Sequence, residues 1–525
     1  MATRSRYVPN EASIEWALKH LEKFGDSDIL PVPLEYKAAS IHRPEIAKEL
    51  SQRCVEDSPL KVPLRISIPK VKGGFRIASI LDPTDCVYYT ALCYETSEKL
   101  EELRIPKSQS VSCSYRINTT NDGDFFHGNT GYKDFQRKTR EHILSGQFSR
   151  VLTLDLSDFY SQISHHRIRN NLDTIAINTE LTLAIENSLN DMASNHHSQG
   201  IPVGPSASII LSEAALIDID QHLLNCGLVF CRYVDDFRIF FKDELSALSA
   251  LRGLTEILFR NHRLPINTSK TGIWSIEDFS NRAFIDEEQL EEEKNTEIVD
   301  NFVSTLDASI ADDFEITSVH AKAIERNVIG ELFERVKSDD PLPLGLTKFV
   351  LRRSRALKTN KIIEGLLEYS IKFLPVLRDA CLYFDVIDKD NKKGFYKEFL
   401  DSLKSNDAVW NLPYFQQWWL ASTLKNPNIS SFAEVREHLN QADNYSVERY
   451  EPLLAARYGQ WHMIRDLKDQ VDNSSDWRKR SIILATSTLS PDEKGHWLSR
   501  FNQSDPLTVA CAFYARNNSD INRLL

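Results

Sequence analysis

The sequence contains no apolar run long enough to cross a membrane. A membrane-spanning helix needs about 18 or more consecutive apolar residues, and none of the 525 residues belongs to such a run. The first six residues, Met-Ala-Thr-Arg-Ser-Arg, also lack the apolar core of a secretory signal. These absences predict a cytoplasmic protein without a membrane partner.

Cysteine is sparse and scattered along the chain. The eight cysteines form no Cys-x-x-Cys pair and show no spacing typical of zinc ligands. We therefore expect small, buried, apolar side chains in a reducing compartment.

The sequence also has no excess of basic residues. Lys and Arg number 63 against 75 Asp and Glu, which gives a net charge of −12 and a pI near 5.7. This balance argues against a protein that coats nucleic acid non-specifically. It leaves room for an enzyme whose basic residues are confined to one channel.

The stretch Leu228–Phe241, LVFCRYVDDFRIFF, predicts a β-hairpin with two carboxylates at its tip. Two apolar runs meet at a tight polar turn, yet Asp235 and Asp236 stand where a structural turn favours glycine. Because adjacent negative charges repel, a divalent cation with oxygen ligands would stabilise the pair. A solvated turn is the alternative for so short a motif.

Further motifs precede and follow this hairpin in a definite order. Asp155 closes the apolar run 150–155 and is followed by an expected helix start. Gln199–Ser208 is a Gly/Pro loop that leads into an apolar helix, and Ile266–Gly272 follows the hairpin. In spacing and order the series resembles palm motifs A, B, C and D of reverse transcriptases, over roughly residues 60 to 275.

The resemblance implies an α+β fold, in which reverse-transcriptase fingers and palm precede an all-helical region. We expect an N-terminal helical segment at 1–60, fingers and palm at 61–285, an acidic linker at 286–300 and a helical C-terminal domain with HEAT-like repeats at 301–525. We interpret the polar segment 112–149 as a surface insertion before a palm strand.

Residues 61–83 predict two strands joined by a turn with basic side chains. Lys70, Lys72 and Arg76 crowd this turn. A solvated hairpin tip is one interpretation. The other is a cationic fork over an incoming triphosphate, which resembles the fingers hairpin of reverse transcriptases and makes the three residues candidates for nucleotide binding.

Nucleotidyl transfer needs charge neutralisation on the attacking hydroxyl and the leaving pyrophosphate, which two metal ions can provide. Asp155 at a strand end and Asp235 at a hairpin turn can converge on such ions, with Asp236 as a third ligand. Mg²⁺ is the expected metal because few carboxylates are offered, and Mn²⁺ is a substitute. The resemblance adds the backbone carbonyl of Leu156.

The residues after Asp155 are candidates for nucleotide binding. Asp158 and Phe159 open a helix whose free N–H groups can receive triphosphate oxygens. Tyr160 holds the position at which reverse transcriptases carry an aromatic ring under the sugar, which implies selection of deoxyribonucleotides. Packing in the palm core is the alternative for this ring.

Two later motifs add further candidates. Gln199 and Gly200 open the Gly/Pro loop, where glycine allows close backbone approach to a base or sugar. Lys270 matches the family's motif D lysine, a candidate proton donor to pyrophosphate. A lone lysine is otherwise most often a solvated surface charge.

The C-terminal half predicts helices throughout, with two groups that each allow two interpretations. Lys348, Arg352 and Arg355 form a basic helix face, which is either solvated or a nucleic-acid contact. An aromatic group favours core packing over a stacking platform for single strands. Its members are Trp410, Tyr414, Phe415, Trp418 and Trp419.

Fingers and palm followed by an all-helical half resemble the bacterial abortive-infection (Abi) reverse transcriptases, and those of P2-like prophages are the most similar in size and arrangement. The resemblance implies a bacterial cytoplasmic protein of phage defence that forms homo-oligomers. It also implies untemplated synthesis from deoxynucleoside triphosphates, primed by the protein, with single-stranded DNA attached to the chain.

Two other functions stay open. A templated RNA-directed DNA polymerase of the retron or intron kind would need a structured RNA partner, but the sequence lacks the retron-like Asn-Ala-x-x-His and Val-Thr-Gly blocks. A non-catalytic scaffold is disfavoured because the motif residues are intact.

Protein priming requires a side-chain hydroxyl that can enter the active site. Tyrosine suits this role because its phenol ionises more readily than serine or threonine. Tyr36 is the first candidate because it follows a Pro-Val-Pro connector ahead of the fingers, with Tyr7 and Tyr132 behind it. Ordinary packing is the alternative role of Tyr36.

Overall fold

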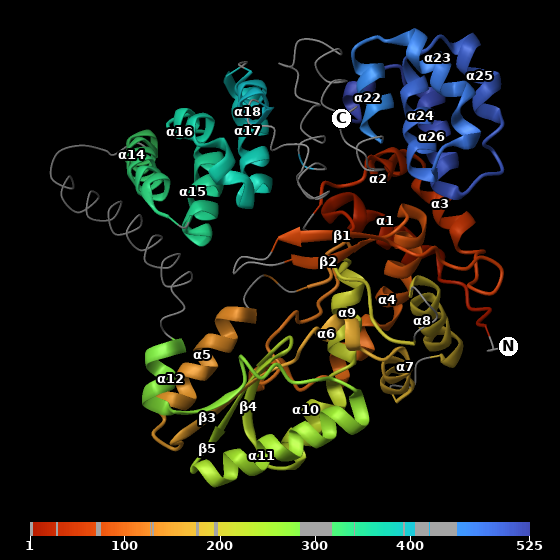
Figure 1. Cartoon of the computed structure of the whole chain (residues 1–525). Coiled ribbons are helices and arrows are strands. Elements are labelled where there is room, and N and C mark those ends of the chain that lie inside the picture. The colour runs from red at the N-terminus through yellow and green to blue at the C-terminus, as the bar shows by residue number, and fades with distance from the viewer. Residues whose placement is uncertain are drawn as a thin grey trace.

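Two small antiparallel sheets lie within a largely helical chain (Figure 1). The structure, a computed structural model, describes residues 4–27, 30–69, 75–126, 128, 131–174, 178–193, 198–283, 318–340, 342–391, 394–404, 419 and 449–525. No helix in this part of the chain is long and apolar enough to cross a membrane.

The larger sheet is the predicted palm and has the strand order β4-β5-β3-β6. Its strands are β3 (Arg150–Asp155), β4 (Val229–Tyr233), β5 (Asp236–Phe241) and β6 (Gly272–Ser275). All neighbours run antiparallel. Since side chains alternate along a strand, Leu152 and Leu154 enter one core while Val151 enters another. Asp155 therefore shares the face of Val151.

Helices cover both faces of this sheet (Figure 1). The Leu152 face packs on α9 (Ser206–Ala214), α10 (Ile217–Asn225) and α11 (Glu244–Ile257). The opposite face packs on α5 (Gly131–Leu144) and α12 (Ile276–Ala283), through Phe135 and Phe279.

The interpretation of residues 112–149 as a surface insertion was wrong. Cys113 and Phe135 are buried in the core beside the sheet, and Ser112 pairs with Arg232 of β4 in an isolated parallel bridge. The segment is polar in sequence because its apolar residues are few, and they divide between the sheet, where Phe135 packs, and a second core, where Phe125 packs against Trp16.

The smaller sheet is the predicted fingers hairpin. β1 (Leu64–Pro69) pairs with β2 (Phe75–Ile80) in antiparallel register. The turn between them, with Lys70 and Lys72, lies outside the described residues. Ile66 and Ile80 are buried in a core shared with the C-terminal helices.

Seven further α-helices lie in the described residues of the N-terminal half. They are α1 (Glu11–Phe24), α2 (Leu34–Ala39), α3 (Arg43–Leu50), α4 (Pro83–Leu103), α6 (Phe159–Gln162), α7 (His165–Asp173) and α8 (Thr179–Met192). α4 is the most central, because its residues 86–93 are all buried. Asp82 starts it by accepting a hydrogen bond from the backbone N–H of Thr84.

The described C-terminal half is helical, as predicted. Its helices are α14 (Ser318–Ser338), α15 (Leu344–Leu357), α16 (Ile363–Glu368), α17 (Leu377–Asn391), α18 (Phe395–Lys404), α22 (Tyr450–Arg457), α23 (Trp461–Asp469), α24 (Asp476–Ala485), α25 (Pro491–Ser499) and α26 (Pro506–Asn517). The α+β fold class is confirmed. The acidic linker lies outside the described residues, and the domain boundaries and HEAT-like repeats stay predictions.

Buried charges join the last helices to the N-terminal half, where α24 and α26 lie beside α2 and α3 (Figure 1). The fully buried Arg480 donates to both carboxylate oxygens of Asp82 at 3.1 Å. Arg449 forms a second buried pair with Glu35. Because an unpaired buried charge is costly, these pairs fix which helices meet.

We expect Arg480→Ala to destabilise the chain strongly, because it leaves the buried Asp82 with only the partly exposed Lys61, 3.4 Å away, as a cationic partner. Breaking a buried pair costs about 3–5 kcal/mol. The matched control is Arg500→Ala, which removes an exposed pair with Asp472 and should cost about 0–1 kcal/mol. Chemical denaturation measures both free energies of unfolding. Equal losses for the two variants would contradict the importance of the buried pair.

Candidate active site

Three aspartates gather at one end of the larger sheet. Asp155, the last residue of β3, stands directly opposite Asp236, the first residue of β5. Tyr233 also pairs with Asp236, so Val234 and Asp235 form the two-residue turn of the β4-β5 hairpin. The predicted hairpin is thus present, with its turn one residue earlier than the Asp-Asp pair.

Burial and mutual repulsion act on these carboxylates. Burial, and next the charge of Asp155, raises the pKa of Asp235. Burial raises the pKa of Asp236 to about 6, against the opposing effect of Arg238. Asp155 therefore lies close enough to both to interact electrostatically, and a bound cation would relieve the repulsion.

The pair Asp155 and Asp235 suits a magnesium ion better than it suits a metal that needs many protein ligands. Among the described residues, no three His, Cys, Asp or Glu side chains are arranged to hold a metal. Mg²⁺ needs only one or two carboxylates, with phosphate and water in the remaining positions. Asp236 is not assembled as a third ligand, and Leu156 lies in a backbone bridge with Ile266 beside Asp155.

Lys270 lies at the site as a cationic partner of Asp155. Its Nζ stands 3.0 Å from Oδ1 of Asp155, and Asn267 donates to Oδ2 at 2.9 Å. The Lys270 ammonium neutralises the Asp155 carboxylate. A cation is therefore favourable at this position, which supports a cation site there. Its side chain is 65% exposed, so Lys270 has room to move toward a bound phosphate.

The turn that carries Asp235 has a strained backbone, and a hydrogen bond from Arg232 fixes it. Val234 has a φ of +53°, a conformation that β-branched residues rarely adopt. Arg232 donates from Nη1 to the carbonyl oxygen of Val234 at 2.9 Å. This contact fixes the backbone immediately before Asp235.

Arg232 is itself held by two buried acids. It is fully buried, and Nη2 donates to Asp220 at 2.6 Å and to Glu213 at 3.0 Å. Arg104 donates to the same Glu213 oxygen at 2.8 Å. Burial alone would raise the pKa of Glu213, but Arg104 and Arg232 hold it below its usual value. Glu213 is therefore charged and is paired with both arginines.

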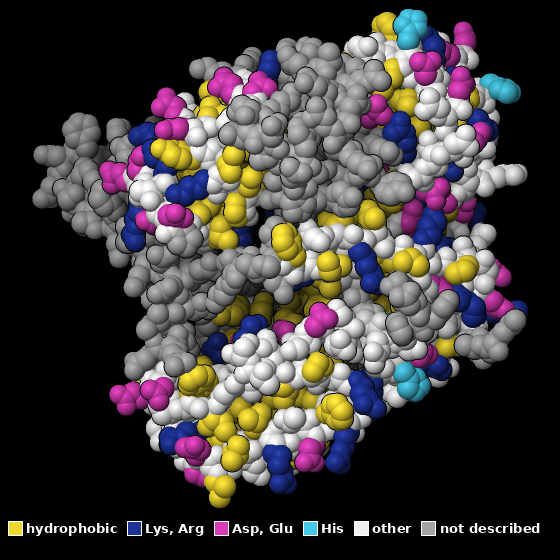
Figure 2. Space-filling view, viewed as in Figure 1, with side chains coloured by type: hydrophobic (Ala, Val, Ile, Leu, Met, Phe, Trp, Pro, Cys, Tyr) yellow, Lys and Arg dark blue, Asp and Glu magenta, His cyan; other side chains and the backbone are white. Residues whose placement is uncertain are grey.

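The fingers hairpin reaches the same site through Arg76. This residue lies on β2, opposite Ile68, and is exposed. Its charge lowers the pKa of Asp235, so its guanidinium acts on the carboxylates from the fingers side. Figure 2 shows the surface hollowed below the hairpin, with basic, acidic and hydrophobic side chains around the hollow.

The residues after Asp155 have divided roles. Asp158 is exposed and has a φ of +49°, whereas Phe159 is buried in the core. The Phe159 side chain therefore packs, and only its backbone could meet a ligand. Tyr160 is partly buried, and its hydroxyl lies 3.3 Å from that of Ser212; burial raises its pKa above the ordinary value.

The loop with Gln199 and Gly200 borders a cavity of about 470 Å³ between β1, β2 and α6. Gly200 has a φ of +88°, and a Cβ there would lie 3.2 Å from the carbonyl oxygen of Ser161. His165 donates from Nε2 to the Gly200 carbonyl at 2.6 Å. Glycine is thus required for this loop to pass so close to α6.

The predicted priming residue Tyr36 does not reach the site, and this position contradicts its assignment. It is 1% exposed, and its hydroxyl donates to Asp26 at 2.5 Å. Burial, and next the charge of Asp26, raises its pKa well above the ordinary value. Tyr36 was chosen because it follows the Pro-Val-Pro connector ahead of the fingers, but its ring packs in the core.

The other two tyrosine candidates differ. Tyr7 donates to Glu95 at 2.6 Å, and burial raises its pKa. Tyr132 of α5 stands edge-on to Tyr233, with ring centroids 5.1 Å apart. Tyr132 thus contacts the β4-β5 hairpin that carries Asp235, and its priming role stays a prediction.

The basic face of the C-terminal half lies on α15, apart from these groups. Lys348, Arg352 and Arg355 all belong to this helix, and Arg352 pairs with Asp379 at 3.1 Å. Of the aromatic group, only Trp419 is among the described residues, and it is 6% exposed.

Comparison with known proteins decides the nature of this region. Residues 68–302 match the family model described as "Reverse transcriptase (RNA-dependent DNA polymerase)". This part of the chain is similar to reverse transcriptase domains, which are nucleotidyltransferases of the DNA polymerase type. No curated protein matches the sequence.

Among solved structures, the chain is similar to two yeast telomerases. Apo telomerase from Candida tropicalis, truncated from its C-terminal domain, matches with 14% identity and a TM-score of 0.31, over 41% of this chain and 50% of that one. Telomerase from Candida albicans with a TWJ fragment of telomeric RNA matches with 12% identity and a TM-score of 0.31, over 82% and 70%. The chain thus spans half the length of the first. The likeness is too slight to bear on function.

Sequence reasoning missed the groups that support the reverse transcriptase carboxylates. Arg232, Glu213 and Asp220 form the buried ion cluster under the turn. The one available signal was an arginine inside an apolar strand, because such a residue must be paired if it is buried. Tyr115 was also missed: its ring centroid lies 6.1 Å from that of Tyr233, and no sequence pattern indicated this contact.

We expect Asp236→Asn to stabilise the metal-free protein at pH 7.5 but not at pH 4. The raised pKa means that the folded state binds this proton more tightly than the unfolded state. Stability therefore falls as pH rises from about 4, the ordinary value, to about 6. The amide of the Asp236→Asn variant stays neutral, so the variant does not lose stability as the pH rises.

The measurement is the thermal unfolding midpoint across this pH range with a chelator present. Asp469→Asn, an exposed position, is the control and should change nothing. A gain for Asp236→Asn that is equal at pH 4 and 7.5 would contradict the raised pKa.

Proposed function

We propose that the protein is a DNA polymerase that joins deoxynucleotides by two-metal nucleotidyl transfer at Asp155 and Asp235. The observation that carries this proposal is the convergence of two carboxylates from separate motifs at one sheet end, where Asp155 raises the pKa of Asp235. The reverse transcriptase domain supports nucleotide substrates and a nucleic acid product.

Asp155 and Asp235 would hold the ions, together with the backbone carbonyl of Leu156. When bound, two Mg²⁺ ions neutralise charge on the attacking oxygen and on the leaving pyrophosphate, and Mn²⁺ is a substitute. Arg76 binds the triphosphate from the fingers side, helped by Lys70 and Lys72. Those two lysines lie outside the described residues.

The remaining residues orient the nucleotide. Tyr160 places its ring under the sugar, and Gln199 and Gly200 border the base or sugar through the loop that needs glycine. Lys270, already at the carboxylates, donates the proton to pyrophosphate. Asp158 and the backbone of Phe159 face the phosphates.

We further propose protein priming from Tyr132. Its ring contacts Tyr233, two residues before Asp235, so its hydroxyl starts near the carboxylates. Untemplated synthesis, homo-oligomers and phage defence rest on the resemblance to Abi reverse transcriptases in motif order and helical C-terminal half. A templated polymerase with a structured RNA partner is the second candidate, because the same palm motifs serve both.

Asp155→Asn and Asp235→Asn should each abolish nucleotide incorporation while the protein stays folded. Each loses a metal ligand, so activity should fall about a thousandfold, the effect of several kcal/mol. The assay incubates purified protein with labelled deoxynucleotides and Mg²⁺, without template or primer. Asp469→Asn is the matched control. Full activity in both variants would disprove the polymerase site.

The same assay separates the two candidate functions. Incorporation without template supports untemplated synthesis. Incorporation that appears only after addition of RNA and a primer supports the templated alternative.

Tyr160→Ala should admit ribonucleotides, because no ring would then collide with the 2′-hydroxyl. We expect the ratio of ribonucleotide to deoxynucleotide incorporation to rise about 10- to 100-fold. Ser212→Ala is the control, because it removes only the hydroxyl that faces Tyr160. Competition between labelled nucleotide pairs gives the ratio. Unchanged discrimination would assign Tyr160 to core packing.

Tyr132→Phe should abolish covalent self-labelling, because phenylalanine has no hydroxyl to bond the first nucleotide. Tyr36→Phe and the exposed Tyr369→Phe should retain it. Mass spectrometry of digested, nuclease-trimmed protein locates the adduct. An adduct on another residue would remove Tyr132 from this role.

A further inference from the structure

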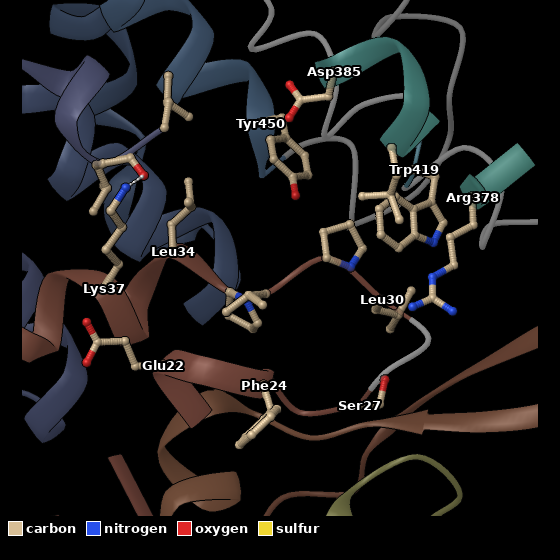
Figure 3. Close-up of a pocket in the computed structure, with 16 residues that line it drawn as sticks. Glu22, Phe24, Ser27, Leu30, Leu34, Lys37, Arg378, Asp385, Trp419 and Tyr450 are labelled. Carbon is tan, nitrogen blue, oxygen red and sulfur yellow. Dashed lines mark hydrogen bonds between the residues drawn. The ribbon is translucent and has the colours of Figure 1, made fainter. Parts of the chain in front are cut away.

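A cavity of about 560 Å³ lies apart from the polymerase site (Figure 3). Its walls come from α1, α2 and the segment between them, from the helix α17, from Trp419 and Tyr450, and from the C-terminal Leu524 and Leu525. Such a volume is within the usual range for small-molecule sites, about 300–1,000 Å³. The described lining contains none of the residues assigned to the polymerase site, although Trp419 belongs to the aromatic group named from the sequence.

One face of α17 supplies the chemistry. Arg378, Leu382 and Asp385 follow at i, i+4 and i+7, so they share one helix face, and all three line the cavity. Among the described residues, Nε of Arg378 and Oδ1 of Asp385 are buried without a hydrogen-bond partner. A buried polar atom without a hydrogen-bond partner is unfavourable, and a ligand with matching groups would offset this cost.

An aromatic wall lies beside the arginine. The guanidinium carbon of Arg378 is 5.8 Å from the ring centroid of Trp419, and Figure 3 shows the two side chains next to each other. The planar guanidinium binds phosphate oxygens in pairs, and an indole ring accepts a stacked base.

The rest of the lining contains a second cation, apolar side chains and one further acid, Glu22, which pairs with Arg43. Lys37 adds a second cation at the wall, where it donates to the Leu524 carbonyl oxygen at 3.0 Å. Phe24, Leu34 and Leu382 are apolar. Oδ2 of Asp385 already accepts from Lys389 at 3.0 Å, so Oδ1 can accept from an amino group.

We propose that this cavity is a second nucleotide-binding site, with the phosphate on Arg378, the base against Trp419, and an amino group of the base donating to Asp385. A free mononucleotide and the terminal nucleotide of a single strand share this chemistry. The site is independent of the polymerase function, since its residues take no part in that site. Its occupant would connect α17 with the N-terminal and C-terminal segments.

Calorimetry of the full chain with AMP and with a 5′-phosphorylated trinucleotide tests the proposal. A chelator suppresses binding at the polymerase carboxylates, and Asp235→Asn should bind as the wild type does. We expect affinity to fall about tenfold or more in Arg378→Ala, because a paired phosphate contact is lost, and severalfold in Asp385→Asn. The exposed Arg335→Ala on α14 is the matched control and should not change it.

Arg378→Lys is the control for misfolding. It keeps the positive charge and should weaken binding less than Arg378→Ala does. Cross-linking with 8-azido-AMP should label peptides of α17 or around Trp419. Tighter binding of AMP would identify a free nucleotide as the ligand, and tighter binding of the trinucleotide a strand end. No binding of either probe, equal binding by Arg378→Ala, or labelling elsewhere would overturn the proposal.

Discussion

The active-site end of the palm sheet depends on one buried guanidinium. Arg232 lies between Glu213 and Asp220 and also holds the carbonyl oxygen of Val234. Removing one member of such a cluster leaves a buried charge unpaired, at about 3–5 kcal/mol. The left-handed backbone of Val234 costs about 1–3 kcal/mol. The ion cluster is strong enough to hold that strained turn, and so to keep Asp235 beside Asp155.

The same constraint, charge that must be paired once it is buried, joins the two halves of the chain. Asp82 caps α4, the central helix of the N-terminal half, and binds Arg480 of α24. The fingers strands bury Ile66 and Ile80 among C-terminal helices. The hairpin that carries Arg76 is therefore supported from the C-terminal half, and the palm carboxylates stand on a separate core.

Sequence pattern was sufficient where local periodicity determines structure. The apolar runs around Asp235 and before Asp155 predicted the strands that bring these carboxylates to one sheet end. Sequence pattern failed where contacts between residues far apart in the chain determine the structure. The polar segment around Phe135 gave no sign that it packs on the sheet, and the prolines before Tyr36 gave no sign that its ring is buried. The partners of Arg232 precede it by 12 and 19 residues, and no periodic pattern connects them.

Mn²⁺ binding tests most directly whether the buried cluster prepares the metal site. Calorimetric titration with Mn²⁺ and a deoxynucleoside triphosphate should find two ions in the wild-type protein and in Arg252→Met, a control at an arginine whose side chain is 83% exposed. Arg232→Met, verified as folded by circular dichroism, should bind Mn²⁺ at least about tenfold more weakly, because a loss of 1.4 kcal/mol already has that effect. Unchanged binding of both ions by folded Arg232→Met would contradict the account.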